Sequence, residues 1–129
     1  MKCLDSDILI GILRNDEDAV RMSRKIDEEG GAFTTSVNAF EILVGARLSA
    51  RQKNLDEARK MLAKLTILDF DEKSADSASQ IFVELTKSGK IIGLKDIFIA
   101  SVAAENGCEL VTRNTEEFSR VSGLKLEKW

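Results

Sequence analysis

Short apolar segments alternate with longer amphipathic ones along the whole chain, and this alternation restricts the folds open to the sequence. Strands are predicted at residues 2–5, 32–34, 66–69, 109–112 and 125–127. Helices are predicted at residues 7–14, 16–29, 36–48, 52–65, 71–88, 95–106 and 114–121. Strands separated by helices of this length favour a parallel sheet covered by helices on both faces. We therefore expect an α/β fold.

The organisation of the chain is predicted to be simple. It has 129 residues, no proline and no linker rich in glycine or serine, so we expect one domain over residues 1–129. Cys3 and Cys108 lie far apart in strand-like apolar segments, which favours buried free thiols. No segment resembles a signal peptide or has the length of a bilayer span. We therefore expect a soluble, cytoplasmic protein with no membrane partner.

The absence of histidine excludes several kinds of chemistry. It rules out histidine general bases, nucleophiles activated by histidine and metal sites with histidine ligands. With no tyrosine and one tryptophan, base stacking is disfavoured as the main way of binding nucleic acid. The net charge of −3 provides no global basic field, so nucleic acid would have to meet a local group of cations. The chemistry that remains is that of 22 aspartates and glutamates.

Acidic side chains recur where a parallel sheet would bind a ligand, beyond the carboxyl ends of its strands. Asp5 ends the first strand, Glu41 lies early in the helix after the second, and Glu117 follows the strand that ends at Thr112. Asp96 opens the least polar helix. Without a cation such a cluster would repel itself. Oxygen ligands of this kind suit Mg²⁺ or Mn²⁺, and the natural reaction class is metal-assisted phosphodiester hydrolysis.

Most of these acids also have a structural interpretation, which the sequence leaves open. Asp5 can cap the helix that follows it. Asp96 can interact favourably with the helix dipole from the first turn. Asn114 and Glu117 have the N-x-x-E spacing of a capping box. A capped loop can still present a carboxylate, so the two interpretations are compatible.

Glu41 is harder to explain by local structure. At about 100° per residue, it falls on the helix face that also carries Val37, Val44 and Leu48. An unpaired carboxylate on an apolar face is costly. Glu41 therefore needs either an arginine partner, for which Arg47 and Arg113 are candidates, or a role in a metal or active site.

Four sequence blocks, in this order, resemble the motifs of PIN-domain ribonucleases, most closely the VapC-type toxins of prokaryotic toxin–antitoxin systems. The blocks are MKCLDSDILI at 1–10, TSVNAFEILVG at 35–45, GLKDIFIA at 93–100 and LVTRNTEEF at 110–118. The resemblance covers essentially the whole chain and implies a PIN-like three-layer α/β/α fold. Two positions depart from the pattern. Glu117 stands where the family commonly has aspartate, and Asp7 where asparagine, serine or threonine is more usual.

The resemblance implies a metal-dependent endoribonuclease acting on single-stranded or looped RNA. Asp5, Asp96 and Glu117 would ligate Mg²⁺ or Mn²⁺, directly or through water, and Glu41 would bind a second ion or orient the attacking water. Thr112 and Asn114 would hold the aspartates by hydrogen bonds. Asp7 would assist the metal or simply be hydrated. The candidates for phosphate contacts are Lys90, Lys95, Arg113 and Arg47.

The same resemblance implies protein partners. VapC-type toxins commonly form homodimers and are silenced by a VapB-type antitoxin, which wraps around the toxin and places a residue in the acidic pocket. The charged amphipathic helices at 16–29 and 52–65 are candidates for the walls of that groove. Plain surface helices would have the same pattern.

Two other functions fit parts of the sequence. A catalytically silent PIN-like binding module is suggested by the departures at Asp7 and Glu117. A haloacid-dehalogenase-like phosphatase would use Asp5 as its nucleophile, because Asp5-Ser6-Asp7 after a strand has the D-x-D pattern. That mechanism also needs a later lysine and an acidic pair, which do not follow in the required way. It also leaves Glu41 unexplained.

Overall fold

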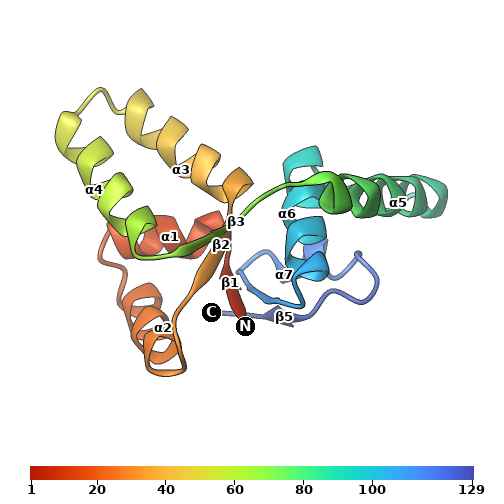
Figure 1. The fold of residues 1–129 in the computed structure, drawn as a ribbon, viewed down its shortest axis with the longest axis horizontal. Coiled ribbons are helices and arrows are strands. Elements are labelled where there is room, and N and C mark those ends of the chain that lie inside the picture. The colour runs from red at the N-terminus through yellow and green to blue at the C-terminus, as the bar shows by residue number, and fades with distance from the viewer.

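The computed structural model describes all 129 residues and consists of short strands alternating with helices (Figure 1). The strands are β1 (Lys2–Leu4), β2 (Phe33–Thr35), β3 (Thr66–Leu68), β4 (Glu109–Val111) and β5 (Leu126–Glu127). The helices are α1 (Ser6–Leu13), α2 (Glu17–Glu28), α3 (Ser36–Leu48), α4 (Gln52–Ala63), α5 (Glu72–Ser88), α6 (Leu94–Glu105) and α7 (Thr115–Phe118). Every predicted element is present, and most ends shift by only one or two residues.

The strands form one parallel sheet in the order β3-β2-β1-β4-β5. Strand β1 lies in the middle, where Cys3 pairs with Phe33 of β2 and with Leu110 of β4. Because all strands run in one direction, their carboxyl ends meet at the same edge of the sheet. Asp5 and Thr112 directly follow the neighbouring strands β1 and β4 at that edge.

The sheet has a hydrophobic core on each face, because successive side chains of a strand point to opposite sides. Cys3 and Leu110 belong to the core beneath α5, α6 and α7. Leu4 and Val111 belong to the core shared with α1, α2, α3 and α4. Figure 1 shows these two groups of helices on opposite sides of the sheet. The predicted three-layer α/β/α arrangement is confirmed.

Helix α3 differs from the expected pattern. Its inner face carries Ile42 and Ala46, which belong to the core shared with α1, α2 and α4. Val44 and Leu48, expected on an apolar inner face with Glu41, are 38% and 81% exposed. The helix is apolar on more than one side, so hydrophobic periodicity alone does not identify the side that packs inward.

Local signals set most helix ends. The side chain of Asp71 accepts a hydrogen bond from the Ser74 backbone N–H at 2.9 Å, which caps α5. Gly89 ends the same helix with a φ of 68°, a left-handed conformation that favours glycine. Helix α7 is shorter than predicted and ends at Phe118. The chain turns after it and returns as β5 beside β4.

Cys3 and Cys108 are buried free thiols, as predicted. Burial raises the pKa of both thiols above the usual range. None of the helices combines the length and the apolarity that crossing a bilayer requires.

Candidate active site

Asp5 occupies the carboxyl end of the central strand and caps helix α1. Its extended backbone, with a ψ of 165°, lets its side chain accept a hydrogen bond from the Ser6 backbone N–H at 2.8 Å. Its own backbone N–H donates to the carbonyl oxygen of Val111 at 3.0 Å, which continues the pairing of β1 with β4. Asp5 is 7% exposed. The capping role expected for Asp5 is therefore confirmed.

Two further donors hold the Asp5 carboxylate from separate elements. Asn38 of α3 donates from Nδ2 to Oδ1 at 3.1 Å. The Thr112 hydroxyl, just after β4, lies 2.7 Å from Oδ2. With Ser6 these contacts occupy both carboxylate oxygens and fix the orientation of the side chain. Asn38 was not predicted as a site residue.

Burial is the largest effect on the ionisation of Asp5 and raises its pKa to about 6. The negative charges of Asp7 and Asp96 raise the pKa further, whereas hydrogen bonds from Thr112 and Ser6 lower it. Asp5 is thus a crowded carboxylate that a nearby cation would stabilise.

Asp96 lies in the first turn of α6 and is half-buried. Burial raises its pKa, and the charges of Glu117 and Glu41 raise it further, while Lys95 opposes the shift. The fold therefore brings Asp5, Glu41 and Glu117, from distant parts of the chain, within electrostatic reach of Asp96. We call Asp5, Glu41, Asp96 and Glu117 the acidic centre.

Glu41 is held between a hydroxyl and an ammonium group. Ser6 donates from Oγ to Glu41 Oε1 at 2.8 Å, and the Nζ of Lys95 lies 3.3 Å from Oε2. The expectation of an arginine partner is therefore wrong for both Arg47 and Arg113. Lys95, the residue next to Asp96 in the sequence, supplies the positive charge instead.

Asn114 supports Glu117 rather than an aspartate. Its side chain forms no cap hydrogen bond, so the expected capping box is wrong. The Nδ2 of Asn114 instead donates to Glu117 Oε2 at 3.2 Å, and its backbone N–H donates to the Thr112 hydroxyl at 3.0 Å. Asn114 therefore connects the residue that holds Asp5 with the carboxylate of Glu117.

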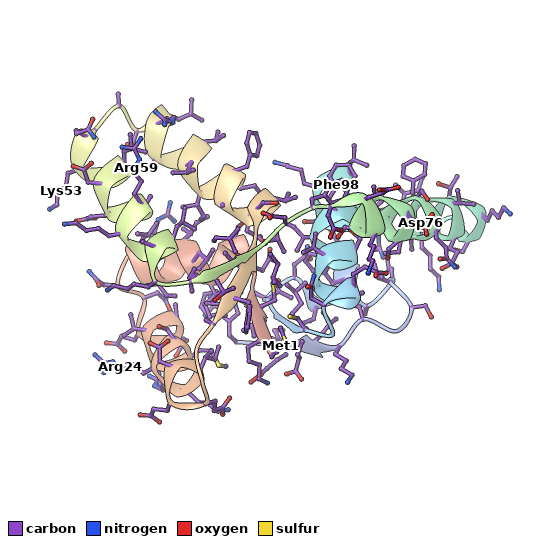
Figure 2. The ribbon with its side chains drawn as sticks, viewed as in Figure 1. Met1, Arg24, Lys53, Arg59, Asp76 and Phe98 are labelled. Carbon is purple, nitrogen blue, oxygen red and sulfur yellow. The ribbon has the colours of Figure 1, made fainter.

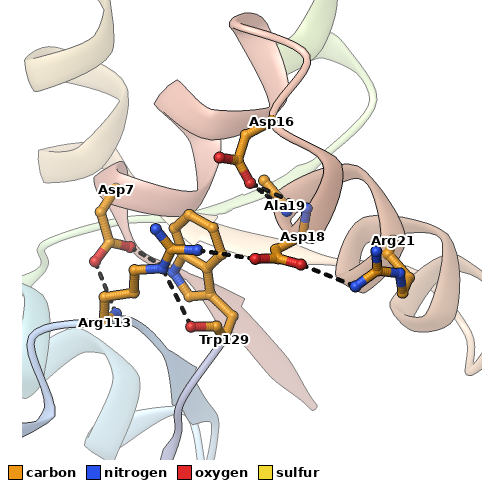
Figure 3. A network of polar contacts seen from close by, with 7 residues as sticks. All are labelled: Asp7, Asp16, Asp18, Ala19, Arg21, Arg113 and Trp129. Atoms are coloured by element: carbon orange, nitrogen blue, oxygen red, sulfur yellow. Dashed lines mark hydrogen bonds and ion pairs between the residues drawn. The ribbon is translucent and has the colours of Figure 1, made fainter.

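Asp7 is half-buried and accepts hydrogen bonds at both carboxylate oxygens. Its Oδ2 accepts from the Arg113 backbone N–H at 2.8 Å and lies 3.2 Å from the Thr112 hydroxyl. Its Oδ1 accepts from the indole Nε1 of Trp129 at 3.0 Å (Figure 3). The chain's own donors therefore already surround this carboxylate, so it is not simply hydrated.

The four cations predicted to contact phosphate lie in different surroundings. Lys95 contacts the acidic centre through Glu41. The side chain of Arg113 stacks on Trp129 instead. Lys90 is exposed in the loop before α6 and forms no ion pair. Arg47 lies on the exposed side of α3 near its far end, so the fold does not bring it to the acidic centre.

The acidic centre fits a hard divalent cation held by few protein ligands. All of its donors are carboxylate oxygens, which Mg²⁺ and Mn²⁺ prefer. No group of three or more such side chains is already arranged to hold an ion. Mg²⁺ usually binds through about one or two carboxylates and keeps several waters. The arrangement therefore suits an ion with waters between it and some of the acids, rather than one in a closed cage.

Residues 2–124 match the family described as the PIN domain. The chain belongs to the PIN-domain family. This PIN domain is 34% identical over 127 residues to the tRNA(fMet)-specific endonuclease VapC of Shigella flexneri, covering 98% of this chain and 96% of that protein. It is 35% identical over 127 residues to Ribonuclease VapC2 of Haemophilus influenzae, with the same coverage of both chains.

Solved structures agree with these relatives. DNA-bound VapBC from Salmonella typhimurium matches this PIN domain with a TM-score of 0.90 at 29% identity, covering 99% of this chain and 97% of that one. VapBC2 from Rickettsia felis, bound to a promoter DNA fragment, matches with a TM-score of 0.85 at 26% identity, covering 99% and 98%. The resemblance to VapC-type PIN-domain ribonucleases is confirmed.

Proposed function

We propose that this chain acts as a single PIN domain over residues 1–129 and is a VapC-type endoribonuclease that depends on Mg²⁺ or Mn²⁺. The placement of Asp5 carries the proposal. This carboxylate is buried at the sheet edge, is held by donors from three elements, and feels the charge of Asp96. The VapC relatives named as nucleases support the same reaction class.

Asp5, Asp96 and Glu117 are the residues that would hold the ion, directly or through water. A bound Mg²⁺ or Mn²⁺ supplies a water of lowered pKa and stabilises negative charge on the phosphate. Thr112 keeps Asp5 in one orientation, and Asn114 does the same for Glu117. These contacts reduce the reorganisation that binding would otherwise require.

Glu41 of the acidic centre would act on the attacking water, and the neighbouring Lys95 would contact the substrate. Ser6 and Lys95 hold the two oxygens of Glu41, and a carboxylate held in this way would be able to position the attacking water or contribute to a second ion. The Lys95 side chain is 60% exposed, which leaves its ammonium group accessible to an RNA phosphate. The other cation near the start of α6 is Lys90, which lies in the loop before this helix and forms no ion pair.

We propose single-stranded or looped RNA as the substrate class. The Shigella flexneri relative is named as specific for tRNA(fMet), so initiator tRNA is the first substrate to test. The protein carries a net charge of −3, so contacts with RNA must come from individual cations such as Lys95.

A VapB-type antitoxin is the proposed protein partner, since solved neighbours of this PIN domain are VapBC assemblies. Two cavities support such a partner. One, of about 300 Å³, is lined by residues of α1, α3 and α4 that include Leu13, Gly45 and Glu41 of the acidic centre. The other, of about 280 Å³, is lined by residues of α1, α2 and α4 that include Ile12 and Met61. Together they would let an extended chain run between helices α2 and α4 toward Glu41.

A homodimer is proposed from the outer face of α3. Phe40, Val44 and Leu48 recur every four residues there and are 59%, 38% and 81% exposed. Large apolar side chains grouped on one helix face mark interaction surfaces more often than isolated ones do. A second copy of the chain would cover them.

Cleavage of RNA by the purified protein tests the proposed activity. Initiator tRNA and a generic single-stranded RNA are incubated with Mn²⁺ or Mg²⁺, and in parallel with EDTA. Wild type is compared with Asp96→Asn and with the exposed control Asp76→Asn. We expect cleavage by the wild type and the control only, and only with metal.

The pattern of failure separates the explanations. Cleavage that continues in EDTA or in Asp96→Asn contradicts the proposed mechanism. If the wild type neither cleaves RNA nor binds Mn²⁺ at neutral pH, the chain is a silent PIN-like binding module. If it binds Mn²⁺ but does not cleave, the RNAs offered are not its substrates.

A further inference from the structure

Trp129 is tied directly to a carboxylate beside the acidic centre, although it lies beyond β5 at a distant point in the sequence. Its indole Nε1 donates to Asp7 Oδ1 at 3.0 Å (Figure 3). Its ring is half-buried and packs against the core shared with α1, α2, α3 and α4. Gly11 of α1 leaves room for it, since a Cβ there would lie 3.1 Å from the ring. The fold thus accommodates the indole in one place.

Arg113 fixes the outer side of the indole. Its guanidinium carbon lies 3.6 Å from the centre of the ring, and its Nε donates to the Trp129 carbonyl oxygen at 3.2 Å. The Nη2 atom of the same guanidinium group lies 3.5 Å from Oδ2 of Asp18 in α2. A guanidinium stacked on an indole and tied to two other groups restricts the ring to one orientation. These contacts give Arg113 a structural role.

Asp7 links Arg113 and Trp129 to the residues that hold Asp5 and Glu117. Its Oδ2 accepts from the Arg113 backbone N–H and lies near the Thr112 hydroxyl. The same hydroxyl is 2.7 Å from Asp5 Oδ2 and accepts from the Asn114 backbone N–H. Asn114 in turn holds Glu117. Asp7 therefore anchors the turn after β4, from which Asp5 and Glu117 are both oriented.

The indole is the one side chain that donates to Asp7 Oδ1. Asp7 Oδ2 accepts from the Arg113 backbone N–H, whereas the Thr112 hydroxyl has a single proton, which its shorter contact directs to Asp5 Oδ2. Without the indole N–H, Oδ1 would have no protein donor and the carboxylate could rotate. Such rotation would release the Arg113 backbone N–H and so loosen the adjacent Thr112, which holds Asp5.

We propose that Trp129, held by Arg113, is a positioning residue for the acidic centre, which it orders through Asp7 and Thr112. This inference rests on the proposed function, because it assumes that the acidic centre binds a divalent cation. Removing a residue that forms a hydrogen bond with a metal ligand typically changes metal affinity about 10- to 100-fold. Since Trp129 acts one step further away, the expected change is about threefold to tenfold.

Calorimetric titration with Mn²⁺ alone tests the proposal. Trp129→Phe keeps an aromatic ring and removes the N–H, so it should bind Mn²⁺ about threefold to tenfold more weakly than the wild type. The matched control is Lys125→Met, which replaces an exposed side chain before β5 that forms no ion pair. The control should keep the wild-type affinity.

A double-mutant cycle distinguishes an effect of Trp129 through Asp7 from a general loosening of the fold. If Trp129 acts through Asp7, then Asp7→Asn combined with Trp129→Phe weakens Mn²⁺ binding less than the sum of the two single effects. Fully additive effects would contradict the proposed route. Arg113→Ala offers a second variant should Trp129→Phe fail to fold, and it should weaken Mn²⁺ binding in the same direction.

The wild type offers an independent readout, because Trp129 is the one tryptophan of the chain. Mg²⁺ should change its fluorescence with the same midpoint that calorimetry gives for Mg²⁺, and Asp96→Asn should abolish the change. An emission that stays constant while Mg²⁺ binds, or equal Mn²⁺ affinity in wild type and Trp129→Phe, overturns the positioning role alone. A wild type that binds neither ion overturns the proposed function together with this inference.

Discussion

The surroundings of Asp5 oppose its negative charge, and this makes the stability of the metal-free protein depend on pH. Burial is the main cause that raises its pKa, from 3.8 to about 6. An acid whose pKa is higher in the folded chain than in the unfolded chain binds its proton more tightly when folded. Ionisation of Asp5 therefore destabilises the fold. This effect is absent below pH 3.8, grows as the pH rises, and is complete above about pH 6.

Replacing Asp5 by a neutral amide should remove this dependence. In EDTA we expect Asp5→Asn to gain stability relative to the wild type as pH rises from about 4 to about 7, by about 2 kcal/mol. Urea unfolding at each pH measures the difference, with Asp76→Asn as an exposed control. A gap between Asp5→Asn and wild type that stays constant or narrows toward pH 7 would contradict the assignment.

Asn38 should matter for both stability and metal binding. It is fully buried, and its Nδ2 donates to Asp5 Oδ1 and to Ser6 Oγ. Asn38→Ala leaves buried groups without partners, so we expect a loss of about 1–3 kcal/mol in the free energy of unfolding. Mn²⁺ affinity should fall about 10- to 100-fold.

Urea unfolding and calorimetry check these two effects of Asn38→Ala. The matched control is Asn106→Ala, at an exposed helix end, which should leave Mn²⁺ affinity unchanged. Unaltered Mn²⁺ binding by a folded Asn38→Ala protein would show that the hydrogen bond to Asp5 has no role in metal binding.

The acidic residues of the centre were easier to identify from the sequence than the residues that form hydrogen bonds with them. Residue type and position after a strand select Asp5, and the position of Asp96 at the start of the least polar helix selects Asp96. Asn38 and Ser6 act across long sequence separations, so their contacts depend on how helices pack. A T-x-x-N spacing at Thr35 indicates a helix cap, which the structure contains, but it does not reveal the second set of bonds from Asn38 to Asp5.

At the scale of helices, two glycines should respond to alanine in opposite ways. A Cβ on Gly11 of α1 would lie 2.7 Å from the Ala19 Cβ of α2, whereas Gly45 of α3 has open space around it. We expect Gly11→Ala to lower the free energy of unfolding by about 1–3 kcal/mol through overpacking. Gly45→Ala should raise it by about 0.5–1 kcal/mol, because alanine favours a helix. Thermal or urea unfolding measures both, and a stabilising Gly11→Ala would contradict the close packing of α1 on α2.

The order of the elements was predictable because β-strand and helix patterns alternate clearly. The side of each helix that packs against the core was not predictable. Helix α3 shows why. Its inner residues are Ile42 and Ala46, yet Val44 and Leu48 on its outer side are equally apolar. Apolar residues of α3 lie both on the side that contacts the core and on the exposed side. The packing of α1 and α4 determines which side faces inward.

Across the molecule, the two ends of the sheet carry different residues, and Met1, labelled in Figure 2, precedes the end at which β1 begins. The carboxyl ends of the strands carry the acidic centre. Lys2 and Glu109 begin β1 and β4 at the opposite ends and form an ion pair, and Lys2 also forms an ion pair with Glu127 of β5. This triad anchors β5, and the chain that follows β5 carries Trp129 to Asp7. Lys2 therefore links β1 to β4 and to β5, the strand that precedes Trp129.

The outer face of α3 allows a test of assembly that is independent of catalysis. If Phe40, Val44 and Leu48 contact a second copy, the wild type should have a mass in solution twice the 14.3 kDa of one chain. Leu48→Lys places a charge in that contact and should weaken dimerisation at least about tenfold, or about 1.4 kcal/mol. Sedimentation over a concentration series measures this.

Gln80→Lys adds the same charge at a polar, exposed position of α5 and is the control for Leu48→Lys. A wild type that stays monomeric, or a Leu48→Lys protein that dimerises normally, contradicts the assignment of this face. Helix α3 also carries Glu41, whose contacts with Ser6 and Lys95 lie within one chain. Because no residue of a second copy is needed for those contacts, monomeric Leu48→Lys should retain wild-type Mn²⁺ affinity. Loss of Mn²⁺ binding on dissociation would instead mean that the dimer contact orders α3 for the acidic centre.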